Sequence, residues 1–188
     1  MKKTIITTII FLIIGALSVY GQEELYECQD GQIQIESDAP LELITASTNE
    51  LKGFINTHKN SFAFQVKVKT ITGFNSPLQQ EHFYENYMET DKYPITSFSG
   101  KIIEKIRFDQ DGVYEIRAKG ILSIHGVEVE RIIKCSLSIE KGQLLIKSTF
   151  SVPIADHNIS IPKLVNLKIA EEIEITVSAV FNPSKKSE

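Results

Sequence analysis

Large apolar side chains alternate with small or polar ones along much of the chain. Within Phe62–Lys69 they occupy every second position, which is typical of a strand with one buried face and one wet face. The same period of two recurs in six further segments, so the chain is predicted to be all-β. These segments are Gln32–Glu36, Ser97–Glu104, Glu115–His125, Glu128–Glu140, Leu144–Val152 and Glu172–Phe181.

Short turn-forming sequences join the later segments. Asp109–Gly112, His125–Gly126 and Glu140–Gln143 all suit β-hairpins, so the strands after residue 95 are expected to form an antiparallel meander. Roughly seven to nine such strands must cover their apolar faces, as a sandwich or an up-and-down barrel does. Successive hairpins favour a barrel of about eight strands, whose interior is either filled by side chains or holds one small ligand.

Two helical segments are expected to interrupt the strands. Ser76 is followed by Pro77 at the first helical position and by Gln79 three residues after the cap, a pattern that begins helices. This first helix is expected at about residues 77–88. A second, shorter helix is expected at about residues 162–169, before the last strand.

The N-terminal segment has the three parts of a secretory signal peptide. Met1–Lys3 is positively charged, Ile9–Ala16 is continuously apolar, and Val19 and Gly21 are small residues at the spacing that signal peptidase requires. An uncleaved membrane anchor is the alternative, but the apolar run is short for a span of about 20 residues. We therefore expect residues 1–21 to be a signal peptide and residues 22–188 to form one periplasmic or secreted domain without a transmembrane segment.

Composition narrows the class of protein. The chain has 188 residues, a formal net charge of −4, 42% apolar residues and 23% charged residues, values that fit one ordinary globular domain. Because no dense run of Lys and Arg precedes the tail, nucleic acid is not expected as a partner.

The two cysteines leave an open question. In an oxidising compartment Cys28 and Cys135 are chemically permitted to form a disulfide. The strand parity of Cys135 points inward, where a free cysteine acts as a small apolar side chain. The sequence is compatible with either arrangement.

Chemical motifs are scarce. The four histidines are not at ligand-pair spacing, and no nucleophile elbow, phosphate loop, zinc motif or nucleotide fingerprint is present, so no metal, no cofactor and no enzyme activity are expected. His125 is expected to be a turn residue. His82 is either a polar group at a pocket mouth or a packed or solvent-facing histidine. Arg131 falls inward by parity, as a rim or bulge position or as a buried charge that binds a polar head group.

Several segments together resemble the YceI-like family. The match spans roughly residues 30–181, and the order and spacing of its motifs are more specific than any one of them. The central motifs are Gln80–Glu89, Asp91–Pro94, Phe98–Lys101 and Gly120–Val127, while Ile35–Pro40 and Ala155-Asp156 near Ile161-Pro162 resemble a branch common in Bacteroidetes.

The resemblance implies an exported protein with a lipocalin-like antiparallel barrel. Some members of the family hold a polyisoprenoid or an isoprenoid quinone in the barrel. The chain departs from many members by lacking an early Trp and by a shorter loop before the helix. An apolar interior is sufficient for such binding, because each buried CH₂ group contributes about 0.8 kcal/mol.

We therefore expect a lipid-binding protein that transports, stores or sequesters an isoprenoid-type chain. The alternative is a filled barrel that serves envelope stress response or protein interaction without a lipid. The oligomeric state stays open, with a homodimer as one option. The side chains expected to line or cap the lipid site are Phe64, Phe74, Phe83, Tyr87, Phe98, Ile116 and Phe150, with the first helix as a side wall or lid and with His82 and Arg131 as polar head-group contacts.

Overall fold

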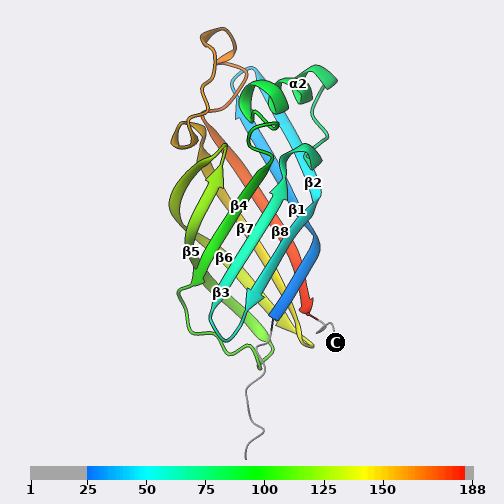
Figure 1. Ribbon diagram of the computed structural model, residues 1–188, viewed down its shortest axis with the longest axis vertical. Helices are drawn as coiled ribbons and strands as arrows, with labels where there is room; N and C mark the ends of the chain where they lie inside the picture. Colours follow the sequence, from blue (N-terminus) through cyan, green and yellow to red (C-terminus); the bar gives the residue numbers. More distant parts are fainter. Residues whose placement is uncertain (1–24, 185–188) are drawn as a thin grey trace, which may run out of the picture.

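Eight antiparallel strands form a closed barrel in the computed structural model, which describes residues 25–184 (Figure 1). Each strand pairs with the next along the chain, and the last pairs with the first, so the predicted barrel is confirmed. The predicted signal peptide at residues 1–21 lies outside the described residues. The strands are β1 (Leu25–Ala39), β2 (Glu42–Asn56), β3 (Ser61–Lys67), β4 (Ile95–Ile102), β5 (Gly112–Ile124), β6 (Val127–Glu140), β7 (Gln143–Pro153) and β8 (Glu172–Pro183).

The first two strands are longer than the alternating pattern predicts. β1 extends well beyond Gln32–Glu36, and β2 lies in a segment for which no strand was predicted. Irregular pairing between Cys28 and Ile33 shifts the β1–β2 register and breaks the strict alternation that reveals a strand in sequence. Both strands are held instead by pairing along almost their whole length.

The end of the barrel that carries both described termini is filled by side chains. We call it the closed end. Phe181, Leu137, Ile139, Leu144 and Ile55 are each no more than 1% exposed and pack together in its core. These residues come from β2, β6, β7 and β8, so the inward faces of strands on several sides of the barrel meet here.

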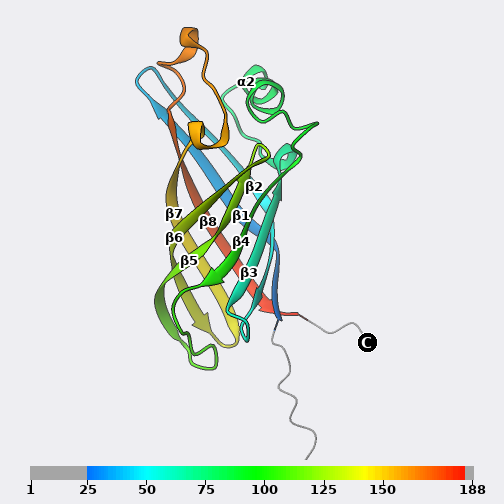
Figure 2. The same cartoon turned by 60° about the vertical axis from the view of Figure 1, so that its left-hand side comes forward.

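The opposite end, which we call the helical end, carries the long connections (Figure 2). The β3–β4 connection holds η1 (Val68–Thr70), α2 (Pro77–His82) and the π-helical turn η2 (Phe83–Tyr87). The Ser76 hydroxyl accepts a hydrogen bond of 3.2 Å from the Gln79 N–H, so the predicted capping of the first helix is confirmed. No helix in residues 25–184 has both the length and the hydropathy to span a bilayer.

The second predicted helix, at residues 162–169, is wrong. The β7–β8 connection contains two 3₁₀ turns, η3 (Ile154–His157) and η4 (Lys163–Val165). The hydrogen bonds from Val165 N–H to the Pro162 carbonyl and from Lys168 N–H to the Val165 carbonyl span three residues, as in 3₁₀ geometry. Leu164 and Leu167 face solvent, so no packed apolar face stabilises a longer helix here.

Two of the strand pairings stop short of the helical end. β6 pairs with β7 only between Ser136–Glu140 and Gln143–Lys147. β2 pairs with β3 only between Lys52–Asn56 and Ser61–Gln65. Toward the helical end the wall therefore separates into one sheet of β7, β8, β1 and β2 and another of β3, β4, β5 and β6, which leaves two seams and a space between the sheets.

Candidate ligand-binding cavity

A cavity of about 480 Å³ occupies the space between the two sheets. Its wall is made mainly of inward aliphatic and aromatic side chains, as the alternating pattern of each strand requires. The barrel therefore combines a filled closed end with a hollow helical end. The apolar residues of the strand walls are Ile33, Ile35, Ile44, Leu51, Phe64, Val66, Phe98, Ala118, Leu122, Ile124, Ile133, Ile146, Phe150, Val152, Ile173, Ile175 and Val177.

Aromatic rings connect the cavity with the closed end. The ring of Phe62 lies 4.9 Å from that of Phe98 and 5.2 Å from that of Phe64, between ring centroids. Phe64 in turn lies 5.5 Å from Phe181, which is fully buried in the closed-end core. Phe64 and Phe98 therefore form the floor of the cavity and are fixed from below by other aromatic rings.

The β3–β4 connection covers the seam between β2 and β3, because its Thr72 pairs with Ser47 of β2 where the β2–β3 ladder has ended. Phe83 and Tyr87 of η2 line the cavity, and the ring of Phe83 lies 4.8 Å from that of Phe74. The hydroxyl of Tyr84 donates a hydrogen bond of 2.6 Å to the Ile71 carbonyl, which holds the helical turn against the segment before it. Burial raises the pKa of the Tyr87 phenol. The helix is thus positioned as a side wall of the cavity.

Most of the side chains predicted to line a ligand lie on the cavity wall, and their contact with a ligand stays a prediction. They are Phe64, Phe74, Phe83, Tyr87, Phe98, Phe150 and the exposed His82.

Ile116 lies outside the cavity wall. It is buried opposite Cys135 in the β5–β6 ladder, two residues beyond Ala118 toward the closed end, and packs in the core, although Cys135 across the ladder still lines the cavity. Its parity was correct, but parity does not say how far along a strand the hollow part extends.

Arg131 also lies outside the cavity wall, in the seam between β6 and β7. Its Nη2 donates a hydrogen bond of 2.6 Å to the Ser151 carbonyl, and its Nη1 lies 3.3 Å from a carboxylate oxygen of Asp156. This position corresponds to a barrel rim rather than to a buried charge that faces a ligand. The guanidinium bridges two strands that no longer pair through their backbones.

His157 is a buried polar residue of the wall that the sequence did not single out. Its side chain has no exposed surface, and its Nδ1 lies 3.1 Å from the Val127 carbonyl. A carbonyl only accepts, so Nδ1 carries the proton and donates. Burial lowers the pKa of His157, partly opposed by nearby backbone carbonyls and by Asp156, which favours the neutral imidazole. It lies in a turn without periodicity, so no sequence signal marks it.

A second polar group lies at the helical end. Gln79 of α2 donates a hydrogen bond of 2.6 Å to the carboxylate of Glu42 on β2, and both side chains line the cavity. The exposed Lys168 also belongs to the wall, so the cavity reaches the surface here. Glu42 was missed because β2 was not predicted.

His125 joins the hairpin between β5 and β6 to both neighbouring connections. It adopts a positive φ of 52° and Gly126 one of 71°, which confirms the expected turn position. Its Nε2 lies 2.7 Å from the Glu89 carboxylate, and its Nδ1 lies 3.1 Å from the His157 carbonyl. This bonding holds the β3–β4 and β7–β8 connections together at the helical end.

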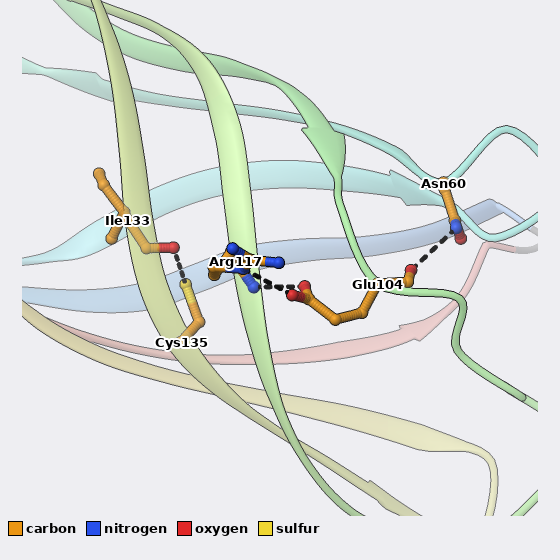
Figure 3. Close-up of polar contacts among 5 residues, drawn as sticks. All are labelled: Asn60, Glu104, Arg117, Ile133 and Cys135. Atoms are coloured by element: carbon orange, nitrogen blue, oxygen red, sulfur yellow. Dashed lines mark hydrogen bonds and ion pairs between the residues drawn. The ribbon is translucent and has the colours of Figure 1, made fainter.

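The two cysteines are free, so the disulfide alternative is wrong. β1 and β6 are not neighbours in the barrel, and each thiol instead approaches a backbone carbonyl, at 3.8 Å from Leu51 for Cys28 and at 3.7 Å from Ile133 for Cys135. Figure 3 shows the Cys135 sulfur on β6 directed at the Ile133 carbonyl, and on the neighbouring β5 the exposed Arg117, whose guanidinium pairs with Glu104 at 2.8 Å. Within residues 25–184 no group of three or more His, Cys, Asp or Glu side chains is arranged to hold a metal ion.

Solved structures share this fold at low sequence identity. A polyisoprenoid binding domain from Saccharophagus degradans, implicated in plant cell wall breakdown, matches with a TM-score of 0.70 and 12% identity over 87% of this chain and 100% of that one. Burkholderia cenocepacia BcnA matches with a TM-score of 0.66 and 11% identity, over 80% of this chain and 95% of that one. The Campylobacter jejuni YCEI protein matches with a TM-score of 0.52 and 13% identity, over 70% and 78%.

Two sequence comparisons complete the structural one. A comparison with curated proteins finds no match to the chain. The family of YceI-like domains matches residues 30–181, which is nearly all of the barrel. The chain therefore belongs to the YceI-like domain family.

Proposed function

We propose that this protein binds one isoprenoid-type lipid, a polyisoprenoid or an isoprenoid quinone, in the barrel cavity and transports, stores or sequesters it. The observation that carries the proposal is a cavity of about 480 Å³ with a mainly aliphatic and aromatic wall. Family membership and the likeness to a polyisoprenoid binding domain support the same class of ligand.

The size of the cavity fits an apolar chain. Small-molecule sites commonly have volumes of about 300–1,000 Å³ and are lined mainly by apolar side chains. At about 0.8 kcal/mol per buried CH₂, a dozen methylenes contribute on the order of 10 kcal/mol before ordering costs are subtracted. Apolar contact alone is therefore sufficient for binding, and a filled barrel without a ligand fits the closed end but not the helical end.

The polar groups of the wall support binding rather than catalysis. His157 donates to a backbone carbonyl, and Gln79 and Glu42 are bonded to each other. These groups occupy different connections and strands, and none of these contacts joins a nucleophile to a general base as acyl transfer requires. Gln79 and Glu42, beside the point where the cavity reaches the surface, fit the role of fixing the polar end of a lipid, whereas His157 is a fully buried part of the wall.

The test is extraction and reloading of the purified protein. We expect organic extraction and mass spectrometry to release an isoprenoid-type lipid, and delipidated protein to take up a radiolabelled polyprenol. Val177→Trp fills the cavity from β8 and should abolish uptake, whereas Val180→Trp, on the outer face of the same strand, should not. Clean extracts together with no uptake by the delipidated protein contradict the proposal.

Export belongs to the same proposal. The charged start, the apolar run and the small residues of residues 1–21 support cleavage after Gly21 and a periplasmic or secreted location. N-terminal sequencing of the protein secreted from a bacterial host should begin at Gln22. Recovery of the uncleaved chain in the membrane fraction contradicts this location.

A further inference from the structure

Exposed leucines gather at the helical end of the barrel. Leu164 in η4 is 95% exposed, Leu41 in the β1–β2 hairpin 67%, and Leu167 after η4 52%. Figures 1 and 2 both show the β7–β8 connection and the β1–β2 hairpin at this end, away from the termini. We call Leu41, Leu164 and Leu167 the leucine tip. Large apolar side chains exposed together on one end of a protein mark an interaction surface.

The leucine tip and the cavity wall are built from the same short segment. Val165, Lys168 and Ile169 line the cavity, while Leu164, just before them, and Leu167, between Val165 and Lys168, face solvent. The tip is also one structural unit, because the Leu41 N–H donates a hydrogen bond of 2.9 Å to the Leu167 carbonyl. A surface that engages the leucine tip therefore lies directly at the mouth of the cavity.

We propose that the leucine tip inserts into the interface of a lipid bilayer, so that an apolar ligand passes between the bilayer and the cavity without crossing water. The inference rests on the proposed function, because an isoprenoid chain resides in membranes and dissolves poorly in water. Three exposed leucines give reversible attachment rather than permanent anchoring, which suits a protein that loads and leaves.

The charges around the leucine tip indicate whether electrostatic attraction or apolar burial dominates the attachment to a bilayer. Lys163 and Lys168 lie beside the leucines, at positions suited to lipid phosphates. Asp38 and Glu42 flank the β1–β2 hairpin, and Glu171 and Glu172 lie at the end of the β7–β8 connection. Because these carboxylates outnumber the two lysines, attachment depends mainly on the apolar side chains and is expected on zwitterionic as well as anionic vesicles.

The chain contains no tryptophan, which provides a clean reporter. We expect the fluorescence of Leu164→Trp to shift to shorter wavelength on addition of phosphatidylcholine vesicles, with and without phosphatidylglycerol. Val113→Trp is the matched control, because Val113 is 68% exposed at the start of β5, at the closed end. Its fluorescence should not change, and a tip reporter that stays unshifted on both kinds of vesicle overturns the proposal.

Flotation with vesicles gives the second measurement. The triple variant Leu41→Ser, Leu164→Ser and Leu167→Ser should partition onto phosphatidylcholine vesicles at least about tenfold less than the wild type, since three apolar contacts are lost. Val113→Ser should partition like the wild type. Equal partitioning of the triple variant overturns the proposal. The proposal is also overturned if the wild type is a dimer, the triple variant is a monomer, and both bind vesicles equally. The leucine tip then joins two copies of the chain.

The two proposals fail separately. Polyprenol uptake from detergent solution measures cavity binding without a bilayer. Polyprenol uptake without vesicle binding contradicts insertion of the leucine tip and supports lipid binding in the cavity. Vesicle binding that depends on the leucine tip, without polyprenol uptake, contradicts lipid binding in the cavity and supports insertion of the tip.

Discussion

Arg131 replaces backbone pairing at the point where β6 and β7 separate. Its Nη2 donates 2.6 Å to the Ser151 carbonyl, in a part of the barrel where the β6–β7 ladder has already ended at Ser136 and Lys147. Ser148 bridges the same seam, because its hydroxyl donates 2.7 Å to the Lys134 carbonyl. The seam beside the cavity is therefore closed by side chains.

Arg131→Ala should lower the free energy of unfolding by about 1–2 kcal/mol, because a charged hydrogen bond across the seam is lost. Arg131→Lys, which keeps one donor, should recover part of this loss. Urea unfolding measures both. Lys119→Ala is the control, since its pair with Glu130 is exposed and such pairs contribute little. A loss no greater for Arg131→Ala than for Lys119→Ala contradicts the bridging role.

Gly100 and Gly120 face each other in the β4–β5 ladder, and a Cβ on either residue overlaps the backbone of the opposite strand. Gly120→Ala should therefore destabilise the barrel by about 1–3 kcal/mol, as overpacked sites do. Gly112→Ala is the matched control, because its added Cβ meets the Tyr114 ring at an ordinary 3.4 Å. Thermal unfolding compares the Gly120→Ala and Gly112→Ala variants. Equal melting temperatures contradict the overlap of the added Cβ with the opposite strand.

The barrel was predictable because its strands have one buried face. From β3 to β8 the alternation of side chains matches the inward and outward faces that the structure shows, and short turns such as His125-Gly126 specify the order of neighbours. The sequence pattern does not predict β2, because Thr45, Ser47 and Thr48 place polar side chains on both its inward and its outward face. Apolar and polar residues therefore do not alternate regularly along this strand.

The cavity was not predictable from the same pattern. Ile116 and Leu122 share one face of β5, yet the first packs in the filled part and the second lines the cavity. The difference depends on where the ladders of β2–β3 and β6–β7 stop, which is set by contacts between segments distant in sequence. The turn that brings His157 under the hairpin carries no periodic signal for the same reason.

His157 should make the stability of the barrel depend on pH. Burial lowers its pKa below the ordinary value of 6.5 in the folded state, so the unfolded chain takes up a proton first as the pH falls. The contribution of neutral His157 to the free energy of unfolding is fully present above about pH 6.5. It is lost as the pH falls toward the folded pKa, and the free energy of unfolding then changes by up to about 1.4 kcal/mol per pH unit. Asp156 and Arg131 oppose each other beside the ring.

Urea unfolding between about pH 5 and pH 8 tests this dependence. His157→Gln removes the titrating ring, so the stability difference between the wild type and this variant should shrink as the pH falls. His58→Gln, at an exposed histidine of the β2–β3 turn, should keep the wild-type profile. A difference between the wild type and His157→Gln that stays constant over this range contradicts the burial of a neutral imidazole.

Cys135 should report occupancy of the cavity. Its side chain lines the cavity, whereas Cys28 is buried in the closed-end core, and burial raises the pKa of both thiols. Because the thiolate is the reactive form, both should react slowly near neutral pH. A small apolar reagent such as methyl methanethiosulfonate should nevertheless reach Cys135 several-fold faster than Cys28, through the cavity. Peptide mapping by mass spectrometry measures the two rates, and after unfolding without reductant both thiols should react.

Loading with a polyprenol should slow the labelling of Cys135 to the rate of Cys28, because the chain fills the path to the sulfur. Unchanged labelling of Cys135 in protein that demonstrably holds the lipid places the ligand somewhere other than this cavity.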